Sequence, residues 1–269
     1  MSEQAQADAV NEAIADPVPE MPDAPGTSVE LMRGIYEEKE DGGVWHTLAE
    51  VRELNGEDEE YLASIEGKDG LLYTDYMTAL LSRAVVRVGD LDVPSGSSAS
   101  ALLNKLILGD RDLLYLAIMK ATYGDTRDVR MACISCAEMN DVVLELDTDF
   151  PITKPDFDVQ KGIDVETSKG VVTLRLPNGE DTVAAQKNSK NDAELNTVML
   201  SRCVVWPKGK APKDPVKWAR SLKVPDRKKL IKALLEIEIG PQMEGVETQC
   251  ASCGKDMPIL LDWVSLLLG

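Results

Sequence analysis

The feature that most constrains the fold is a set of four short motifs that occur twice, in the same order, along the 269-residue chain. Asn-Gly-Glu-Asp, Leu-Ser-Arg, Asp-Arg and Cys-x-x-Cys begin first at Asn55, Leu81, Asp110 and Cys133, and again at Asn178, Leu200, Asp226 and Cys250. The two occurrences of each motif are separated by 123, 119, 116 and 117 residues. Collinear matches at a nearly constant spacing indicate an internal duplication, so we expect two tandem copies of one module.

Hydrophobic periodicity predicts the elements of each copy. In the first copy it predicts a segment at 45–54, helices at 57–65, 71–88 and 99–123, and then a β-hairpin in which apolar residues alternate around the cysteine pair. We therefore predict an α+β fold of two pseudosymmetric modules, each mainly helical with a β-hairpin. The predicted parts are an acidic, largely disordered tail (1–43), a first module (44–150), an acidic linker (151–169) and a degenerate second module (170–269).

The cysteine pairs predict a metal site. Cys133, Cys136, Cys250 and Cys253 supply four thiolates, the number that a structural Zn²⁺ needs for closed tetrahedral coordination. If the modules pack about a pseudo-twofold axis, the two turns, each a zinc knuckle, meet at one ion. Two separate redox pairs or four unligated thiols are the alternatives, but the strand-like flanks do not fit a thioredoxin-type motif.

The remaining reactive side chains have plain structural interpretations. Cys203 lies in an apolar run opposite Ala84 of the first copy, so we expect a small core residue. Asp110 and Asp226 suit the first turn of a helix, where a carboxylate interacts favourably with the helix dipole. His46 is the only histidine and is not expected to be a ligand or a general base.

The sequence contains no catalytic or nucleotide-binding signature. A single histidine leaves no Ser-His or Cys-His pair, and no Gly-x-x-x-x-Gly-Lys-Ser/Thr or Gly-x-Gly-x-x-Gly motif occurs. No stretch approaches the roughly 20 apolar residues of a membrane span, and the first residues lack a signal-peptide pattern. We therefore expect a non-enzymatic protein with no small-molecule substrate and no membrane contact.

Charge points to protein partners. The net charge of −18 would repel a phosphate backbone, so nucleic acid is not the expected partner. The sign reverses over 208–232, where ten Lys and Arg residues stand against Asp214 and Asp226. This basic segment is interpreted either as a solvated helix face or as a docking surface for an acidic protein.

Three segments of the first copy resemble one known family. LNGEDEEYLAS, LLSRAVVRVG and LLNKLILGDRDLLYLAIMKATYGD, followed by the cysteine pair, resemble the T4-type phage baseplate proteins, small hub-assembly proteins of tailed bacteriophages. Gly109-Asp110-Arg111 and Ala121-Thr122-Tyr123-Gly124 are the most distinctive parts. The resemblance covers residues 47–150, with a weaker echo in 170–269; the two copies and the acidic tail depart from the small family members.

The resemblance implies a role in building the tail baseplate, either as a hub assembly factor or chaperone or as a subunit retained in the virion. The implied partners are other baseplate or tail proteins, met in the host cytoplasm during assembly, and no catalytic residues carry over. The alternative is a zinc-ribbon protein that binds nucleic acid or regulates through the basic segment 208–232.

Overall fold

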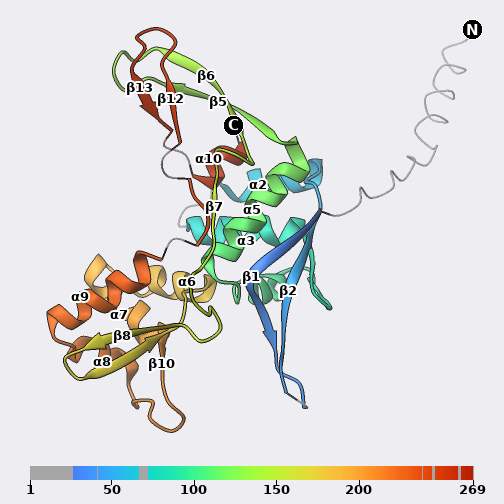
Figure 1. Ribbon diagram of the computed structural model, residues 1–269. Helices are drawn as coiled ribbons and strands as arrows, with labels where there is room; N and C mark the ends of the chain where they lie inside the picture. The colour runs from blue at the N-terminus through green and yellow to red at the C-terminus, as the bar shows by residue number, and fades with distance from the viewer. Residues whose placement is uncertain are drawn as a thin grey trace, which may run out of the picture.

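The computed structural model describes residues 27–40, 42–66, 72–237, 239–243, 246–259 and 262–268, and it has a mixed α/β architecture (Figure 1). Two units and an arm can be distinguished. We call residues 27–123 the first unit, residues 163–235 the second unit, and residues 126–145 with 247–258 the hairpin arm. The arm projects from the first unit on the side away from the second unit (Figure 1).

The first unit combines an antiparallel sheet, in the order β1-β2-β3-β4, with four helices. Its elements are β1 (Thr27–Glu37), β2 (Val44–Val51), α2 (Gly56–Glu66), α3 (Tyr73–Ala84), β3 (Val85–Val88), β4 (Leu91–Asp92), α4 (Ser97–Leu103) and α5 (Leu108–Tyr123). Ten residues of α5, all between Gly109 and Met119, are buried, which places this helix at the centre of the main core. Gly124 follows α5 with a φ of 88°, a conformation that ends a helix and that glycine adopts without strain.

The second unit has a similar order of elements on a smaller scale, without a described strand that corresponds to β4. It contains β8 (Ile163–Thr167), β9 (Gly170–Leu174), α6 (Gly179–Lys187), α7 (Asp192–Cys203), β10 (Val204–Val205), α8 (Pro215–Ser221) and α9 (Val224–Leu235). In each unit a hairpin precedes two helices, and a third strand then pairs with the second strand of the hairpin. Val85 pairs with Val51 in the first unit, and Val204 pairs with Leu174 in the second.

The chain after α9 returns to the first unit and completes its core. Strand β11 (Gly240–Pro241) pairs with β7 (Ile152–Thr153), and the arm consists of β5 (Thr126–Ala132), β6 (Met139–Glu145), β12 (Glu247–Gln249) and β13 (Asp256–Pro258). In α10 (Trp263–Leu268), the Trp263 ring lies 5.9 Å from Tyr115 and 6.2 Å from Phe150. The second unit has its own cluster around Leu174, Leu200 and Leu230.

Several expectations need correction. The predicted tail, 1–43, extends too far: residues 1–26 lie outside the described residues, but 27–37 form β1, in which Leu31 and Ile35 face the core. The helix expected over 71–88 ends at Ala84 and becomes β3, and the one expected over 99–123 is divided into α4 and α5. The segment expected as a linker, 151–169, contains β7 and β8. In the described part of the chain, no helix is long and apolar enough to cross a bilayer.

Candidate metal centre

The four predicted ligands lie together at the end of the hairpin arm. Cys133 and Cys136 are in the turn between β5 and β6, and Cys250 and Cys253 are in the turn between β12 and β13. All four sulfur atoms lie within 4.8 Å of one another, with 3.8 Å between Cys133 and Cys253 and 3.6 Å between Cys136 and Cys250. Zn–S bonds of about 2.3 Å in a tetrahedron require sulfur separations of about 3.8 Å. The cluster therefore has the size of a four-thiolate zinc site.

The two turns have the same backbone geometry. The Cys133 N–H donates to the Glu138 carbonyl at 2.8 Å and the Cys133 carbonyl accepts from the Ala137 N–H at 2.8 Å. In the other turn, the Cys250 N–H donates to Lys255 at 3.0 Å and the Cys250 carbonyl accepts from Gly254 at 2.9 Å. Each turn therefore fixes its first cysteine through two backbone hydrogen bonds.

The residue after the second cysteine is left-handed in both turns. Gly254 has a φ of 66°, and Ala137, which occupies the corresponding position, has a φ of 61°. Among the described residues, Ala137 is the one non-glycine residue with a positive φ. An L-residue in this region is strained, so the first turn keeps its shape at a cost that the second avoids.

Backbone amides make the cluster favourable for thiolates. The Ser135 N–H lies 3.4 Å from the Cys133 sulfur, and it lowers the pKa of that thiol together with the Cys136 amide. The Cys253 amide lowers the pKa of Cys250 to about 6. The Glu138 amide also lowers the pKa of Cys136, but burial and the neighbouring thiols outweigh it and raise that pKa to about 12. Four thiolates this close repel one another, so full deprotonation requires a bound cation.

Asn140 is a buried residue of the arm that the sequence did not single out. Its Oδ1 accepts a hydrogen bond from the Ala251 N–H at 2.9 Å, and its Nδ2 donates to the Glu138 carbonyl at 2.9 Å. The side chain therefore links the first turn to the second, although the two are 111 residues apart. Asn140 is a positioning residue for the cluster.

Cys203 and His46 lie outside the cluster, as expected. Cys203 is fully buried in the core of the second unit. The Nε2 atom of His46 lies 3.0 Å from the Glu37 carboxylate, and its Nδ1 accepts from the Asp90 N–H at 3.3 Å. This places the ring proton on Nε2 and makes His46 a link between β2 and the turn after β3.

The two Asp-Arg aspartates have a role beyond the helix dipole. Asp110 and Asp226 lie in the first turns of α5 and α9, and each accepts from a hairpin of its own unit. Asp110 accepts from the N–H groups of Met32 and Gly34 at 2.6 and 2.7 Å, and Asp226 accepts from the Ser168 N–H at 2.9 Å. These carboxylates fasten each unit's last helix to its sheet.

Comparison with known proteins identifies a family. The family model described as "T4 bacteriophage base plate protein" matches residues 95–265, which include both cysteine pairs and the whole second unit. No curated protein and no solved structure shows a significant match to the chain.

Proposed function

The chain belongs to the T4 bacteriophage base plate protein family, and from that membership we propose that it is a structural or assembly protein of the tail baseplate or hub that acts through contacts with other baseplate or tail proteins. The observation that carries this proposal is the family match over most of the chain. The absence of a catalytic signature in the sequence agrees with a non-enzymatic role. The protein would meet its partners in the host cytoplasm during assembly and remain in the virion if it is a retained subunit.

Zinc is the metal that best fits the cluster of Cys133, Cys136, Cys250 and Cys253. Soft thiolate ligands in a tetrahedral set of four favour Zn²⁺ over hard cations, and the short separations between the sulfur atoms support this choice. With no position left for water or substrate, the ion would be structural. It would join β5 and β6, which follow the first unit, to β12 and β13, which follow the second.

The same reasoning supports tandem, pseudosymmetric modules as the origin of the site. Apart from β4, which has no described counterpart in the second unit, both units have the same order of strands and helices. Both are followed by a hairpin with a left-handed residue after the second cysteine. In this proposal each duplicated module contributes half of one metal centre. Neither half would bind the ion tightly alone, so zinc would make the arm dependent on both modules.

The zinc content and the thiol count test the metal centre. We expect one zinc per chain in protein purified without chelator, and four thiols that become reactive when it is removed. Cys133→Ser and Cys250→Ser should lose the metal, while Cys203→Ala, the matched cysteine variant outside the cluster, should retain it. Protein without zinc and with a freely reactive cluster would contradict the site.

The baseplate role is tested separately in infected cells. Affinity purification of the tagged chain should recover baseplate or tail proteins, and protein analysis of finished particles shows whether the chain stays in the virion. Abundant chain in mature particles supports a retained subunit, and its absence supports a transient assembly factor. A tagged chain that recovers no baseplate or tail protein and is also absent from finished particles would overturn the proposed role.

A further inference from the structure

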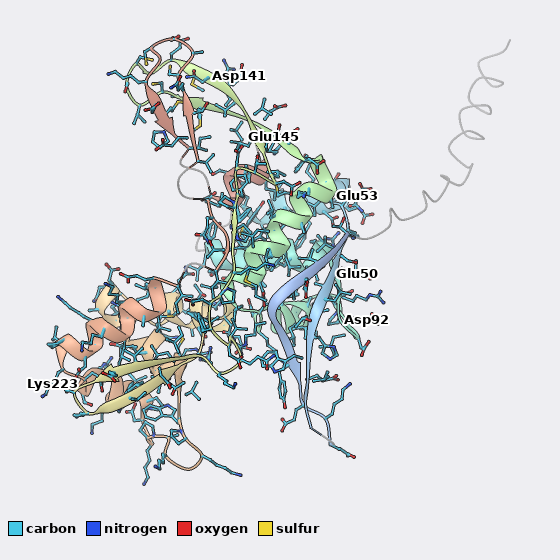
Figure 2. The ribbon with its side chains drawn as sticks, in the orientation of Figure 1. Glu50, Glu53, Asp92, Asp141, Glu145 and Lys223 are labelled. Carbon is cyan, nitrogen blue, oxygen red and sulfur yellow. The ribbon has the colours of Figure 1, made fainter. Side chains whose placement is uncertain are left out.

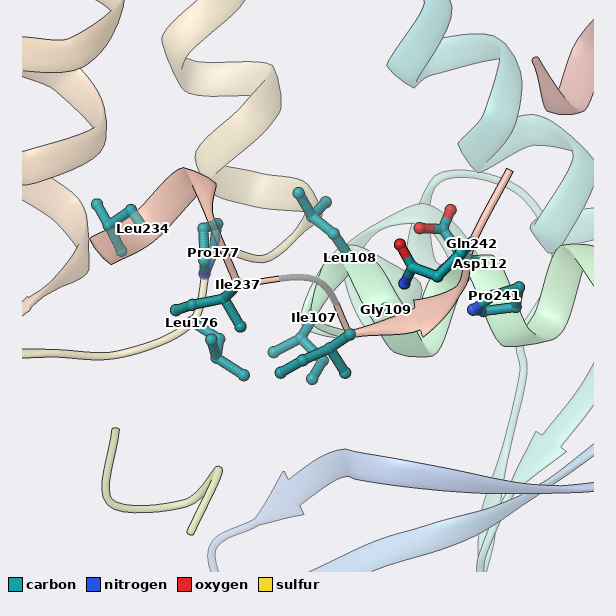
Figure 3. Close-up of a pocket in the computed structure, with 11 residues that line it drawn as sticks. Ile107, Leu108, Gly109, Asp112, Leu176, Pro177, Leu234, Ile237, Pro241 and Gln242 are labelled. Carbon is teal, nitrogen blue, oxygen red and sulfur yellow. The ribbon is translucent and has the colours of Figure 1, made fainter. Parts of the chain in front are cut away.

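The two units of one chain pack head to tail through a loop and a turn. Residues 177–180 of the second unit, which we call the docking loop, lie against residues 104–108 of the first unit, which we call the receiving turn. The Leu108 N–H donates to the Pro177 carbonyl at 3.3 Å, and the Gly179 and Glu180 N–H groups donate to carbonyls of the turn at 3.2 and 3.0 Å. Figure 3 shows Leu108 and Pro177 at the cavity of about 240 Å³ that remains at this junction.

Gly179 makes this close approach possible. A Cβ atom at Gly179 would lie 2.5 Å from the Asn104 Oδ1 and 2.8 Å from the Arg111 Nη1, both in the first unit. The corresponding residue of the first unit is Gly56, in the first copy of Asn-Gly-Glu-Asp. A Cβ atom at Gly56 would meet no described atom within 4 Å. Within the described part of a single chain, no close contact therefore requires a glycine at position 56.

The surface around Gly56 corresponds to the second unit's side of the internal junction, but no described residue packs against Gly56 there. Residues 54–57 correspond to the docking loop, because Leu54 and Asn55 stand where Pro177 and Asn178 stand in the second unit. A recess of about 420 Å³ lies beside this outer docking loop, with walls that include Leu54, Gly56, Leu62 and Tyr123. The lining is mixed, with Asn55, Glu59 and Thr122 beside the apolar side chains, so the recess can take a small apolar side chain that has basic residues next to it.

The second unit carries the matching outer receiving turn. The spacing of 116 residues between Asp110 and Asp226 makes residues 220–224 equivalent to 104–108. Within this turn Val224 is 64% exposed, so its apolar side chain is available for a contact with another chain. Arg220 and Lys223 are exposed beside it. Figure 2 shows Lys223 at the outer edge of the second unit, far from Glu53 of the first.

The two outer surfaces carry opposite charge. Glu53, Glu57, Glu59 and Glu60 are exposed around the outer docking loop, and Arg220, Lys223 and Lys228 are exposed around the outer receiving turn. Considering only the residues with described positions, none of these seven forms an ion pair. The imbalance extends to whole regions: 27–162 holds 27 acidic and 13 basic residues, whereas 163–235 holds 8 acidic and 15 basic residues.

We propose that copies of this chain associate head to tail, with the outer docking loop (54–57) of one copy seated on the outer receiving turn (220–224) of the next. Val224 enters the recess beside Gly56, and the glutamates around the loop face the basic residues around the turn. The contact repeats between chains the junction already present within each chain. Such a heterologous interface closes into a ring or continues as a filament, according to the rotation between neighbours.

Light scattering and sedimentation of the full chain, across protein concentration and salt, test this contact. We expect concentration-dependent oligomers at low salt and about tenfold weaker association at high salt, because screened surface charges attract less. Gly56→Leu, which fills the recess, should leave monomers that unfold at an unchanged temperature.

A charge exchange makes the test specific. E57K/E60K and K223E/K228E should each be monomeric, because each places like charges across the interface. An equimolar mixture should assemble again, because every contact then joins opposite charges. K208E/K210E, which makes the same charge change in the loop before α8, should assemble like the native chain.

Three results would overturn the proposal. These are a native chain that stays monomeric at low salt, charge-reversed variants that still assemble, and a mixture that does not recover. Capture of DNA or of an acidic protein by 208–232 in a chain that never self-associates would assign the basic surface to that partner instead. Zinc binding and recovery of tail proteins do not depend on this contact, so its failure would leave the proposed baseplate role intact.

Discussion

Asp58 and Asp181 occupy equivalent positions in the two units, and each fully buried carboxylate is held between two arginines. Asp58 accepts from the Arg52 Nη1 at 2.6 Å and from the Arg83 Nε at 2.5 Å. It also accepts from the Asn55 N–H at 3.0 Å, which closes the first turn of α2. The carboxylate thereby joins a strand end, the start of one helix and the end of another.

The second unit repeats these contacts. Asp181 accepts from the Arg175 Nη1 at 2.6 Å, the Arg202 Nε at 2.8 Å and the Asn178 N–H at 3.0 Å. Two of the four repeated motifs, Asn-Gly-Glu-Asp and Leu-Ser-Arg, thus meet at one buried ion pair in each unit. This shared contact gives a physical reason for both motifs to occur twice.

Neutralising either aspartate should destabilise its unit. Asp58→Asn and Asp181→Asn keep the shape of the side chain but leave arginine donors poorly compensated, so we expect a loss of about 2–4 kcal/mol in the free energy of unfolding. Glu166→Gln, on an exposed residue of β8, is the control and should change stability by less than about 0.5 kcal/mol. Denaturant titration measures both. Equal stability of the aspartate variants and the control would contradict a structural role.

The same aspartates should contribute to acid unfolding. Burial alone would raise their pKa, but hydrogen bonds from Arg52 and Arg175 outweigh it, and the pKa of both Asp58 and Asp181 is lowered. A lowered folded-state pKa adds stability above the unfolded-state pKa of about 3.9, and this contribution is lost as the pH falls through the folded-state pKa. Between about pH 5 and about pH 2, the free energy of unfolding should therefore fall less steeply with falling pH in the Asn variants than in the native chain.

Exchanging Ala137 and Gly254 tests the strain in the cysteine turns. Ala137→Gly removes the Cβ atom from a left-handed residue and should stabilise the loaded arm by about 1 kcal/mol. Gly254→Ala introduces the same strain and should destabilise it by a similar amount. Thermal unfolding with zinc bound, together with competition against a chelator, would measure both effects. Changes of the same sign in the two variants would show that φ is not the cause.

The repeated motifs predicted the order of elements well because each motif marks an element boundary. Arg52 and Arg175 were missed, although both lie three residues before Asn-Gly-Glu-Asp, so a closer comparison of the copies could have found them. The break between α4 and α5, residues 104–107, contains no glycine or proline, although Gly109 follows just inside α5. Arg111 holds the break in place: its Nη1 donates to the Asn104 Oδ1 at 3.0 Å and to the Leu103 carbonyl at 3.3 Å.

The four ligands could be predicted because Cys-x-x-Cys spacing is itself a local signal of a metal turn. Their meeting in space was predicted only on the condition that the two modules pack about a pseudo-twofold axis. Spacing alone does not determine it, since it depends on the chain returning from the second unit to the arm. Strand β1 was assigned to the tail because the acidic composition extends over residues 1–43. In the fold, Asp110 binds the bulge at 32–34, a contact between residues almost 80 positions apart.

The thiol of Cys203 should react at a different rate from the four thiols of the cluster. Burial raises its pKa to about 12, so it should stay unreactive while the second unit is folded. After chelation, four thiols should react rapidly and the fifth only at the rate of unfolding. Cys203→Ala should remove the slow phase at little cost in stability, since Ala84 fills the equivalent position in the first unit. Five thiols reacting at one rate would contradict this separation.

Asn140 should control how the two cysteine turns are placed relative to each other. Asn140→Ala removes the acceptor of the Ala251 N–H and one of the two donors to the Glu138 carbonyl, which still accepts from the Cys133 N–H. This loss should cost about 1–1.5 kcal/mol, and zinc should be lost to a chelator at about tenfold lower concentration. Asn140→Asp retains an acceptor for the Ala251 N–H but loses the donor to Glu138, so it should fall between the native chain and the alanine variant. Asp141→Asn, on the adjacent exposed residue, is the control and should bind zinc like the native chain. If the alanine variant keeps native zinc affinity, the sulfur positions are set by the strands alone, and Asn140 would serve only to fill the space between the turns.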